Sequence, residues 1–430
     1  MSAAAERLLG PDLRPDEAFA RALDEADPLA ASRERFEIPP GPDGRTAAYL
    51  VGNSLGPLPK GAREALADEL DRWSARGVDG WFDGPDGWYG LDERFRAGLA
   101  DLAGARPAEI AVLNGLTVNL HLALASFFRP RGRRRKILLD APAFPSDLYA
   151  ARTQLAWHGL DPAADLLVAG ADRTDGADEE ALEEVLAARG DEIAVVLVAG
   201  VNFLTGRRLD LERIARAARA AGAVTGTDLA HAIGNVPLRL HDWDVDFAVW
   251  CHYKYVNAGP GAPGGLFVHE RHASRPETPR LGGWWGNDPE TRFRLQLEPE
   301  FRPRPDAGGW QVGTPPILGL APLGPALDAF AAAGLPALRD KSLRLTAWLE
   351  WLLSVRCPEG LEIVTPADPE RRGAQLSLRV RGDGRALQDR LQVVGVIADF
   401  REPDILRLAP APLFNGFHDA WRAVEALAVG

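Results

Sequence analysis

The chain has 430 residues, of which 46% are hydrophobic and 26% charged, a balance typical of a folded globular protein with a sizeable core. Its net charge of −12 argues against nucleic acids and anionic membranes as partners, because both repel an acidic protein. Two cysteines alone form neither a zinc site nor a disulfide framework, and this scarcity fits a reducing compartment.

The beginning of the chain shows no targeting signal. It is polar and acidic and lacks the apolar core of a secretory signal. No run in the chain approaches the roughly 18 uncharged apolar residues that a membrane span needs. We therefore expect a cytoplasmic protein. Residues 1–70, with the turn-rich stretch YLVGNSLGPLPK, are expected to pack on a C-terminal domain.

Residues 71–325 are expected to form a large domain. Within it, short apolar runs alternate with longer amphipathic ones. The predicted strands lie at 110–114, 136–142, 193–200, 223–228, 246–250 and 264–269. The predicted helices include 115–128, 146–157 and 209–222. Such alternation predicts a mostly parallel sheet covered by helices on both faces.

Two further segments of this domain stand out by composition. The run RPRGRRRK at 129–136 is strongly basic, but it joins an apolar helix to a strand, so a solvated turn is favoured over a nucleic-acid patch. Residues 276–316 are rich in Gly, Pro and Trp and show little periodicity. Long irregular segments in folded domains are often functional.

Residues 326–430 change character and predict a separate small domain. A helix is expected at 343–353, with short strands at 374–380, 396–400 and 405–410. The predicted fold class is therefore α/β, with a large parallel-sheet domain followed by a small α+β domain.

Ligands of such sheets bind beyond the carboxyl ends of the strands, and three predicted strand ends carry suitable residues. Leu116 and Thr117 open a helix whose free N–H groups suit a phosphate, although Thr117 could simply cap the helix. Phe144 offers a ring for stacking. Asp228, with His231 three residues on, could hold a protonated ring nitrogen or serve as a helix N-cap.

Lys254 follows the next predicted strand and lies between two tyrosines in the stretch CHYKYVNAGPG. It is one of only four lysines among 49 basic residues, the others being Lys60, Lys136 and Lys341. Arginine cannot lose its proton, whereas a buried lysine can act as a neutral nucleophile; a surface lysine on a loop is the alternative. Phosphate cradle, stacking ring, pyridinium partner and amine together match the needs of pyridoxal phosphate.

Five stretches of the chain resemble the kynureninase family. They are GNSLG at 52–56, FPSD at 144–147, the run at 227–261, GGWWGN at 282–287 and GTPPIL at 313–318. The likeness extends from about residue 45 to about residue 425 and is densest in the third stretch. It implies a fold-type-I pyridoxal-phosphate enzyme of the aspartate aminotransferase superfamily, with a mostly parallel seven-stranded sheet in the large domain.

The resemblance also implies a cofactor site. Lys254 would link covalently to pyridoxal 5'-phosphate, Asp228 would pair with its ring nitrogen, and Phe144 would stack on its ring. The remaining contacts from the same chain would be Leu116, Thr117, Asp147, His231 and Tyr253. From the partner subunit of a homodimer, the site would receive Trp284 and Thr314. Some relatives carry Ser where this chain has Ala199, so whatever hydrogen bond that serine gives is absent here.

For the substrate, the resemblance implies that Arg407 clamps the α-carboxylate, a role that suits a bidentate guanidinium. From the residues alone, an arginine at a strand edge is the alternative. The other implied substrate contacts are Ser54, Trp81 and Thr314. Relatives that prefer the 3-hydroxy form carry Asn at the position of Thr314 and a His in the region near Trp81. Thr314 is shorter than Asn, and Trp81 would close the space for a ring hydroxyl, so the resemblance favours L-kynurenine over its 3-hydroxy form.

Kynureninases hydrolyse the Cβ–Cγ bond of L-kynurenine to anthranilate and L-alanine, a reaction of tryptophan catabolism and of NAD biosynthesis. The resemblance implies the same reaction here, with 3-hydroxykynurenine as an alternative substrate. The implied catalytic residues are Lys254, as the base that removes the α-proton, Asp228, and Tyr253 for proton transfer.

Two other functions stay open. A cysteine desulfurase on the same fold needs a nucleophilic cysteine on a mobile loop, but Cys251 lies at a strand end and Cys357 precedes a proline. A non-catalytic binding protein on the same fold would not need the intact set of Asp228, Lys254 and Arg407. The residues therefore favour an enzyme, and no metal is expected in its site.

Overall fold

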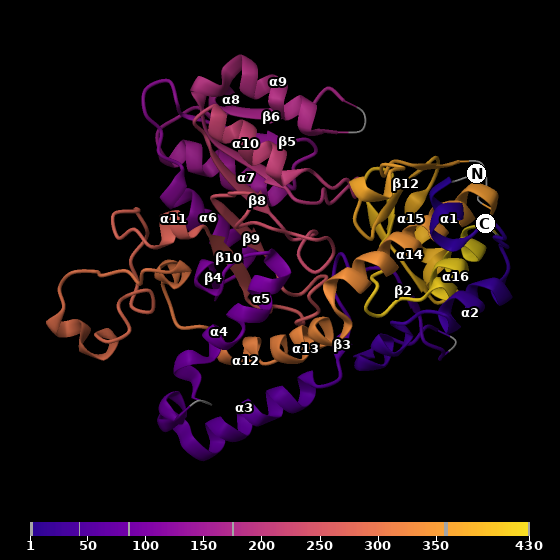
Figure 1. Ribbon diagram of the computed structural model, residues 1–430, viewed down its shortest axis with the longest axis horizontal. Helices are drawn as coiled ribbons and strands as arrows, with labels where there is room; N and C mark the ends of the chain where they lie inside the picture. The colour runs from indigo at the N-terminus through magenta and orange to yellow at the C-terminus, as the bar shows by residue number, and fades with distance from the viewer. Residues whose placement is uncertain (1–2, 43, 85–86, 174–175, 357–359, 429–430) are drawn as a thin grey trace.

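Two domains with separate cores make up the computed structural model, which describes residues 3–42, 44–84, 87–173, 176–356 and 360–428. The large domain fills the left and upper part of Figure 1, and the small domain lies at the right with the N- and C-terminal helices. Helix α14 (Leu335–Arg356) connects the two, because Leu338 belongs to the large core and Leu345 to the small one.

A seven-stranded sheet with almost entirely buried residues forms the centre of the large domain. In spatial order its strands are β4 (Ile110–Leu113), β10 (Gly264–Val268), β9 (Phe247–Trp250), β8 (Val224–Asp228), β7 (Ile193–Ala199), β5 (Lys136–Asp140) and β6 (Leu166–Ala169). Strand β10 is antiparallel to both its neighbours, and the other neighbouring pairs are parallel. The predicted mostly parallel, seven-stranded sheet is confirmed.

Strand β6 is the one strand of this sheet that the sequence pattern does not predict. Its four residues are mostly half-buried, because it forms the edge of the sheet. It also follows directly on the short helix α8 (Pro162–Asp165). With so short a run, neither periodicity nor turn residues mark a strand.

Helices cover both faces of the sheet because alternate strand residues point to opposite sides. On β7, Val195 and Leu197 join the cluster under helices α6 (Leu116–Phe127) and α7 (Pro145–Trp157). Val196 and Val198 join the opposite cluster, whose helices include α5 (Arg96–Ala103), α9 (Glu179–Arg189) and α10 (Leu211–Ala220). The carboxyl ends of β5, β7, β8 and β9 therefore meet at one edge of the sheet, between these two layers.

The basic run at 129–136 forms a turn, as predicted, but only part of it faces solvent. Arg133 is exposed, whereas Lys136 is buried and its amine lies 2.9 Å from Asp165. The guanidinium of Arg134 donates to three backbone carbonyls, those of Gly190, Ile193 and Ala221. The prediction of a solvated turn is wrong for Arg134 and Lys136, which bind neighbouring loops of the same domain.

The small domain contains a four-stranded antiparallel sheet. Its order is β11 (Leu361–Ile363), β12 (Leu376–Val380), β15 (Ile405–Leu408) and β14 (Asp399–Arg401). Helices α15 (Gly384–Val393) and α16 (Phe417–Ala428) share its core with α14. The strand expected at 396–400 is divided in two, since β13 (Val396–Ile397) pairs with β2 (Ala48–Tyr49) and β14 pairs with β15.

The N-terminal segment packs on this small domain. Ala5 of helix α1 (Ala3–Leu9), Leu23 of helix α2 (Glu17–Glu25) and Leu50 all join the small core. Asp27 and Lys341 form a buried ion pair at 2.7 Å that ties the segment to α14.

The helices at the junction of the domains do not follow the expected boundaries. Helix α3 (Ala62–Arg76) packs on α12 (Ile317–Leu320) and α13 (Leu323–Ala333). The boundaries at 70/71 and 325/326 fall inside α3 and α13, whereas the two cores divide within α14. In the described part of the chain, no single helix is long and apolar enough to cross a membrane, although residues 317–333 and 335–356 reach those limits together as a pair bent by 81°.

The irregular segment at 276–316 projects away from the sheet at the left of Figure 1. It contains the 3-10 turns η7 (Arg292–Leu297) and η8 (Ala307–Trp310). Its C-terminal part is anchored, because Trp310 is buried beside α6 and donates to Ser126 at 2.9 Å. Its outer part presents apolar side chains to solvent, among them Leu281, Trp284, Phe293, Leu297 and Phe301.

Candidate functional site

A cavity lies where the carboxyl ends of the parallel strands meet. Its lining contains all eight cofactor-site residues that were predicted from within one chain, namely Leu116, Thr117, Phe144, Asp147, Asp228, His231, Tyr253 and Lys254. The same lining includes Ala199, Val201, Phe203 and Ala230. Phe203 and Val201 were missed, although they follow the strongest predicted strand; applying the strand-end rule to β7 would have found them.

The loop that carries Lys254 is fixed on both sides of the lysine. The indole of Trp250 donates to His252 Nε2 at 2.8 Å, and His252 Nδ1 donates to the carbonyl of Pro263 at 2.6 Å. Burial lowers the pKa of His252 to about 4, so this ring is neutral and keeps its acceptor nitrogen. Gly56 N donates to the carbonyl of Tyr253 at 2.8 Å.

Gly56 explains part of the GNSLG motif. A Cβ atom at this position would meet Asn257 Oδ1 at 2.1 Å and the carbonyl of Lys254 at 2.6 Å. Only glycine allows the N-terminal segment to approach the lysine loop this closely.

Lys254 is half-buried and points at other functional groups of the cavity. Its Nζ lies 3.1 Å from His231 Nε2 and 5.7 Å from the ring centre of Phe144. Burial lowers the pKa of His231 well below its ordinary value, and the charge of Lys254 adds to this effect. His231 is therefore neutral, and the alternative of an ordinary surface lysine does not hold for Lys254.

Two buried carboxyl groups face the same cavity. Asp228 at the end of β8 accepts the N–H of Ala230 at 2.7 Å, and Asp147 lies in the first turn of α7. Burial raises the pKa of both, and the negative charge of Asp228 raises that of Asp147 further. Both carboxyl groups are therefore easier to protonate than exposed ones, and Asp147 more so than Asp228.

The cavity fits pyridoxal phosphate by its unsatisfied polar atoms. Within the described residues, two buried atoms of its lining have no hydrogen-bond partner: Asp147 Oδ1 and His231 Nδ1. Buried polar atoms are rarely left so, which points to a polar ligand. Phe144 is 37% exposed and packs edge-on against Phe203, with ring centres 5.2 Å apart, so one face can take a flat ring.

The first turns of two helices meet at one side of the cavity. Thr117 Oγ1, at the start of α6, lies 2.8 Å from Ser146 Oγ, at the start of α7. Free N–H groups and hydroxyls at helix starts bind phosphate. Ser146 was not predicted individually, although it belongs to the FPSD motif.

Arg407 reaches the cavity wall from the small domain. It is 1% exposed on β15, an inner strand of its sheet, so the alternative of a strand-edge arginine is wrong. Its Nε donates to Asp399 Oδ1 at 3.0 Å and its Nη1 to the carbonyl of Phe203 at 2.7 Å. Ser54 Oγ lies 3.3 Å from Arg407 Nη2 and donates to Asp399 at 2.6 Å.

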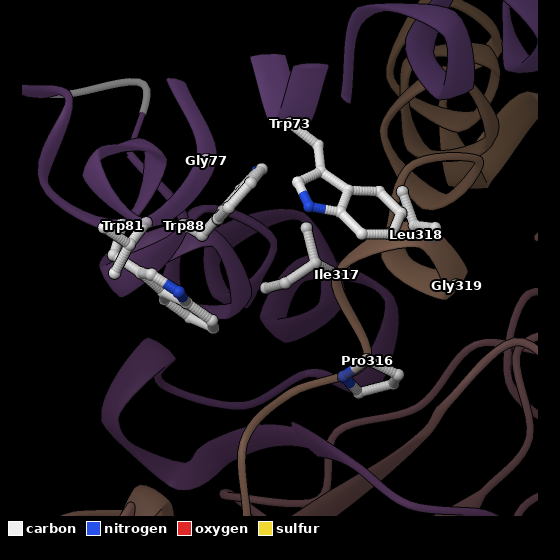
Figure 2. Close-up of a pocket in the computed structure, with 9 residues that line it drawn as sticks. Trp73, Gly77, Trp81, Trp88, Pro316, Ile317, Leu318 and Gly319 are labelled. Carbon is white, nitrogen blue, oxygen red and sulfur yellow. The ribbon is translucent and has the colours of Figure 1, made fainter. Parts of the chain in front are cut away.

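Three predicted site residues lie elsewhere in the chain. Trp81 contributes to an apolar groove of about 520 Å³, in which its ring lies edge-on to Trp88 (Figure 2). The other groove residues are Trp73, Gly77, Val78, Pro316, Ile317, Leu318 and Gly319. Trp284 is 36% exposed and Thr314 is exposed, and neither lines the Lys254 cavity. One chain therefore does not bring these three residues to Lys254.

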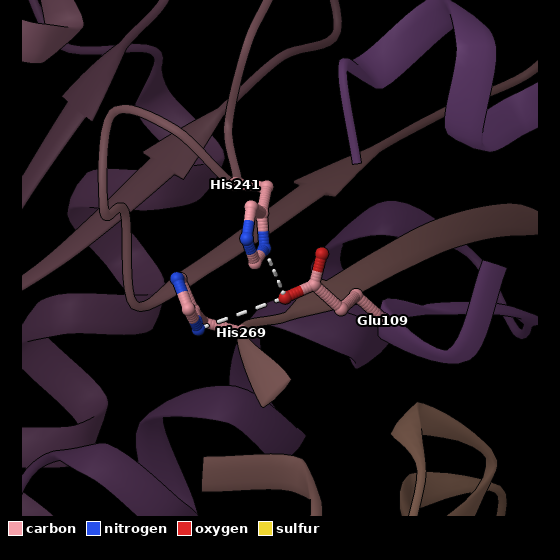
Figure 3. Close-up of side chains that lie close together, drawn as sticks. All are labelled: Glu109, His241 and His269. Carbon is pink, nitrogen blue, oxygen red and sulfur yellow. Dashed lines mark hydrogen bonds and ion pairs between the residues drawn. The ribbon is translucent and has the colours of Figure 1, made fainter. Parts of the chain in front are cut away.

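Glu109, His241 and His269 form another cluster, at the opposite edge of the sheet (Figure 3). Nδ1 of His241 and of His269 lie 2.9 and 3.6 Å from Glu109 Oε1. The two rings are stacked at 4.8 Å and inclined by only 24°, whereas an ion bound by two imidazoles must lie in both ring planes. Glu109 and His269 instead accept the backbone N–H groups of Glu270 and Arg271, so we assign the cluster to fixing this helix start.

The cysteines do not resemble desulfurase nucleophiles. Cys251 is 2% exposed at the end of β9, and burial raises the pKa of its thiol, so it is neither accessible nor activated. Cys357 lies outside the described residues.

Solved structures share this fold at low sequence identity. The cystine C–S lyase C-DES, in complex with cysteine persulfide, aligns with a TM-score of 0.74 over 89% of this chain and 97% of its own, at 18% identity. The cysteine desulfurase CsdA from Escherichia coli gives 0.73 over 93% and 97%, at 19% identity. These values establish the fold-type-I architecture and nothing about the reaction.

Sequence relatives are far closer. Residues 338–427 match the kynureninase C-terminal domain family. The kynureninase of Xanthomonas campestris pv. campestris strain B100 is 52% identical over 410 residues, covering 94% of this chain and 96% of the relative. The kynureninase of Xanthomonas euvesicatoria pv. vesicatoria strain 85-10 is 52% identical over 413 residues, covering 95% and 96%. The resemblance inferred from the motifs is confirmed, and this chain belongs to the kynureninase family.

Proposed function

We propose that this chain is a pyridoxal-phosphate-dependent hydrolase that cleaves the Cβ–Cγ bond of L-kynurenine to anthranilate and L-alanine. The observation that carries the proposal is the convergence of Lys254, His231 and the carboxyl pair Asp147–Asp228 in one cavity. A neutral histidine beside the amine and two buried carboxyl groups with raised pKa provide the groups that acid–base chemistry requires.

The cofactor, when bound, supplies an electron sink for the carbanions that form on the substrate. Lys254 would hold the cofactor covalently, and its amine, when free, would accept the α-proton of the substrate. Asp228 would keep the ring nitrogen protonated, because an ion pair at its buried position is shielded from water. Phe144 would stack on the ring, and the helix starts at Leu116 and Thr117 would bind the phosphate.

Proton transfer at the cavity is assigned to two groups. Lys254 Nζ lies 3.1 Å from Nε2 of neutral His231. This ring nitrogen can accept a hydrogen bond from the charged amine or, in the other tautomer, donate one to the neutral amine. Burial raises the pKa of the Tyr253 phenol above its ordinary value, so Tyr253 acts as a proton donor rather than as a phenolate. Asp147 and His231 complete the cofactor contacts.

Arg407 binds the substrate α-carboxylate, with Ser54 beside it. Asp399 pairs with both Nε and Nη2 of the guanidinium, at 3.0 and 2.8 Å, and the Phe203 carbonyl accepts from Nη1, so the plane of the guanidinium is fixed. A fixed, planar fork favours two-pronged binding of a carboxylate.

The enzyme acts as a homodimer with shared active sites. Trp284 and Thr314 would enter the partner's cavity, and Trp81 would contribute to substrate binding there. The exposed apolar side chains around the groove and on the segment at 276–316 support an interface between two copies of this chain. We assign the homodimer to the cytoplasm, in tryptophan catabolism, with L-kynurenine preferred over 3-hydroxykynurenine.

Anthranilate fluorescence tests the proposal directly. The purified protein is mixed with L-kynurenine, with and without added pyridoxal phosphate, and anthranilate and L-alanine should appear in equal amounts only in the loaded protein. Sulfide release from cysteine without anthranilate formation would instead establish the desulfurase alternative.

A further inference from the structure

A loop of the large domain is held by side chains of the small domain. The loop at 202–206 follows β7, and three successive backbone carbonyls of this loop accept hydrogen bonds across the domain boundary. Phe203 O accepts from Gln375 Nε2 at 3.0 Å, Leu204 O from Ser377 Oγ at 2.6 Å and Thr205 O from Thr365 Oγ1 at 2.6 Å. The three small-domain side chains are at most 4% exposed, so these bonds are sheltered from water.

The base of this loop is held by the large domain. Asn202 Nδ2 donates to the carbonyl of Pro142 at 3.0 Å, and its Oδ1 accepts the N–H groups of Leu204 and Thr205. The backbone of the loop is therefore fixed from both domains. Phe203 is the loop residue that also lines the cavity.

Phe203 contacts the site through both its ring and its backbone carbonyl. Its ring packs edge-on against Phe144, the ring assigned to cofactor stacking, at 5.2 Å and 77°. Its carbonyl accepts from Arg407 Nη1 at 2.7 Å. The position of one backbone carbonyl thus affects both the cofactor wall and the orientation of the guanidinium.

Gln375 is the side chain that fixes this carbonyl. It is fully buried, its Nε2 donates to Phe203 O at 3.0 Å and to Ser377 Oγ at 2.9 Å, and its Oε1 accepts from Asn53 Nδ2 at 2.8 Å. Asn53 precedes Ser54, whose hydroxyl lies 3.3 Å from Arg407 Nη2. A single buried amide therefore links the GNSLG segment, the loop and the neighbourhood of Arg407.

We infer that Gln375 is a positioning residue for substrate carboxylate binding, acting through the Phe203 carbonyl on Arg407. The inference rests on the proposed role of Arg407. Asp399 holds Nε and Nη2 of the guanidinium at 3.0 and 2.8 Å, and the Phe203 carbonyl is the contact that fixes Nη1. Without the Gln375 amide, Phe203 O loses a donor that positions it, and the guanidinium is left free to turn about its pair with Asp399, away from the orientation that two-pronged binding of a carboxylate needs. Ligands without a carboxylate make no use of that orientation.

The test compares two small amines that differ only in the carboxylate. L-Alanine and ethylamine are titrated against the loaded enzyme, and binding is followed by the visible absorbance of the cofactor. For Gln375→Met, which has similar volume but no amide, we expect the apparent Kd of L-alanine to rise about tenfold, because a hydrogen bond that orients a charged group is lost. The apparent Kd of ethylamine should stay unchanged.

Thr365→Val is the matched control. It removes a bond from the same buried seam, but to the Thr205 carbonyl, and it leaves the contacts of the Gln375 amide in place. A general loosening of the seam would weaken L-alanine binding equally in both variants and would overturn the inference. Equal weakening of L-alanine and ethylamine in Gln375→Met would overturn it as well.

Gln375→Glu provides a second test if the methionine variant does not fold. It keeps the shape and the acceptor for Asn53 but replaces the amide that donates to Phe203, so the same selective loss of L-alanine binding is expected. Because the titration requires no turnover, its result is independent of the kynurenine assay. A wild-type enzyme that binds both amines equally would contradict the role of Arg407 itself and with it the inference.

Discussion

The Lys254 cavity and the tryptophan groove around Trp81 are two concave regions of opposite character. The cavity brings charged and polar groups together with apolar side chains at strand ends and helix starts, and Lys254 and His231 contact one another within one chain. The groove is lined mostly by apolar side chains from helix ends and irregular segments, among them Trp73, at 60% exposed, and Val78, at 74%. One chain supplies the whole lining described for the first region, whereas the second exposes apolar surface of the kind that another molecule often covers.

The largest expected effect concerns the cavity. Lys254→Ala should abolish the visible absorbance of the loaded enzyme and lower kcat by at least about a thousandfold, because both the covalent link and the base are lost. Anthranilate fluorescence and an absorbance spectrum measure the two effects. Lys60→Ala, at an exposed lysine, is the control and should change neither. Normal turnover in Lys254→Ala would show that this cavity is not the active site.

The buried His252 in the lysine loop predicts that the free energy of unfolding depends on pH. The folded-state pKa of His252, about 4, lies below the ordinary value of 6.5, so the unfolded chain binds the proton more readily. Stability should therefore be lost as pH falls from about 6.5 to about 4, by about 3 kcal/mol from this group.

Urea unfolding of the wild type and of His252→Gln at pH 7 and pH 4 isolates this contribution. The difference between the two proteins cancels other titrating groups, such as Asp140, whose pKa is raised by burial to about 6 and which acts in the opposite direction. Identical pH dependence in the two proteins would show that His252 is not a neutral, buried ring.

The roles assigned to Trp81 and Thr314 predict which substrate the enzyme prefers. If Trp81 and Thr314 enclose the aromatic end of the substrate, kcat/KM for L-kynurenine should exceed that for 3-hydroxykynurenine by about tenfold. Trp81→His should narrow the ratio, because it opens space and offers a hydrogen-bond partner. Trp157→His, at a side chain that is 87% exposed, is the control. A preference of the wild type for the hydroxylated substrate would contradict the assigned roles of Thr314 and Trp81.

The smallest expected signal tests whether the Lys254 cavity of one copy meets the segment at 276–316 of a second copy in a dimer. Lys254→Ala and Trp284→Ala should each be weakly active, but mixing and exchanging their subunits in equal amounts should restore about a quarter of the wild-type activity. Half of the dimers are then hybrids, and one of the two sites in each hybrid is intact. No gain after verified subunit exchange would mean that Trp284 does not act across the interface.

The carboxyl ends of parallel strands lie at the same edge of a sheet. For this reason, residues that line the Lys254 cavity could be predicted from the sequence. Thr117, Phe144, Asp228 and Lys254 each follow a strand with a clear apolar pattern, and such ends meet at one edge of a sheet. Phe203 follows an equally clear strand, but its contribution depends on a backbone carbonyl that no side-chain pattern marks.

Other features depend on contacts between segments far apart in the chain, and sequence patterns do not reveal them. The strand expected at 396–400 divides because β2, some 350 residues earlier, competes with β15 for pairing. Trp81 and Trp284 belong to segments without periodicity, so their positions follow from packing rather than from local pattern.

The arrangement of the small core has a consequence for synthesis of the protein. Ala5, Leu23 and Leu50 leave the ribosome first, yet the cluster that they complete is built from residues beyond Leu345. The buried charge of Asp27 likewise waits for Lys341. Domains generally fold as they emerge, and the large domain can do so while the N-terminal helices remain without their partners. Helices α1 and α2 therefore stay without their packing partners until α14 and the strands after it have been made.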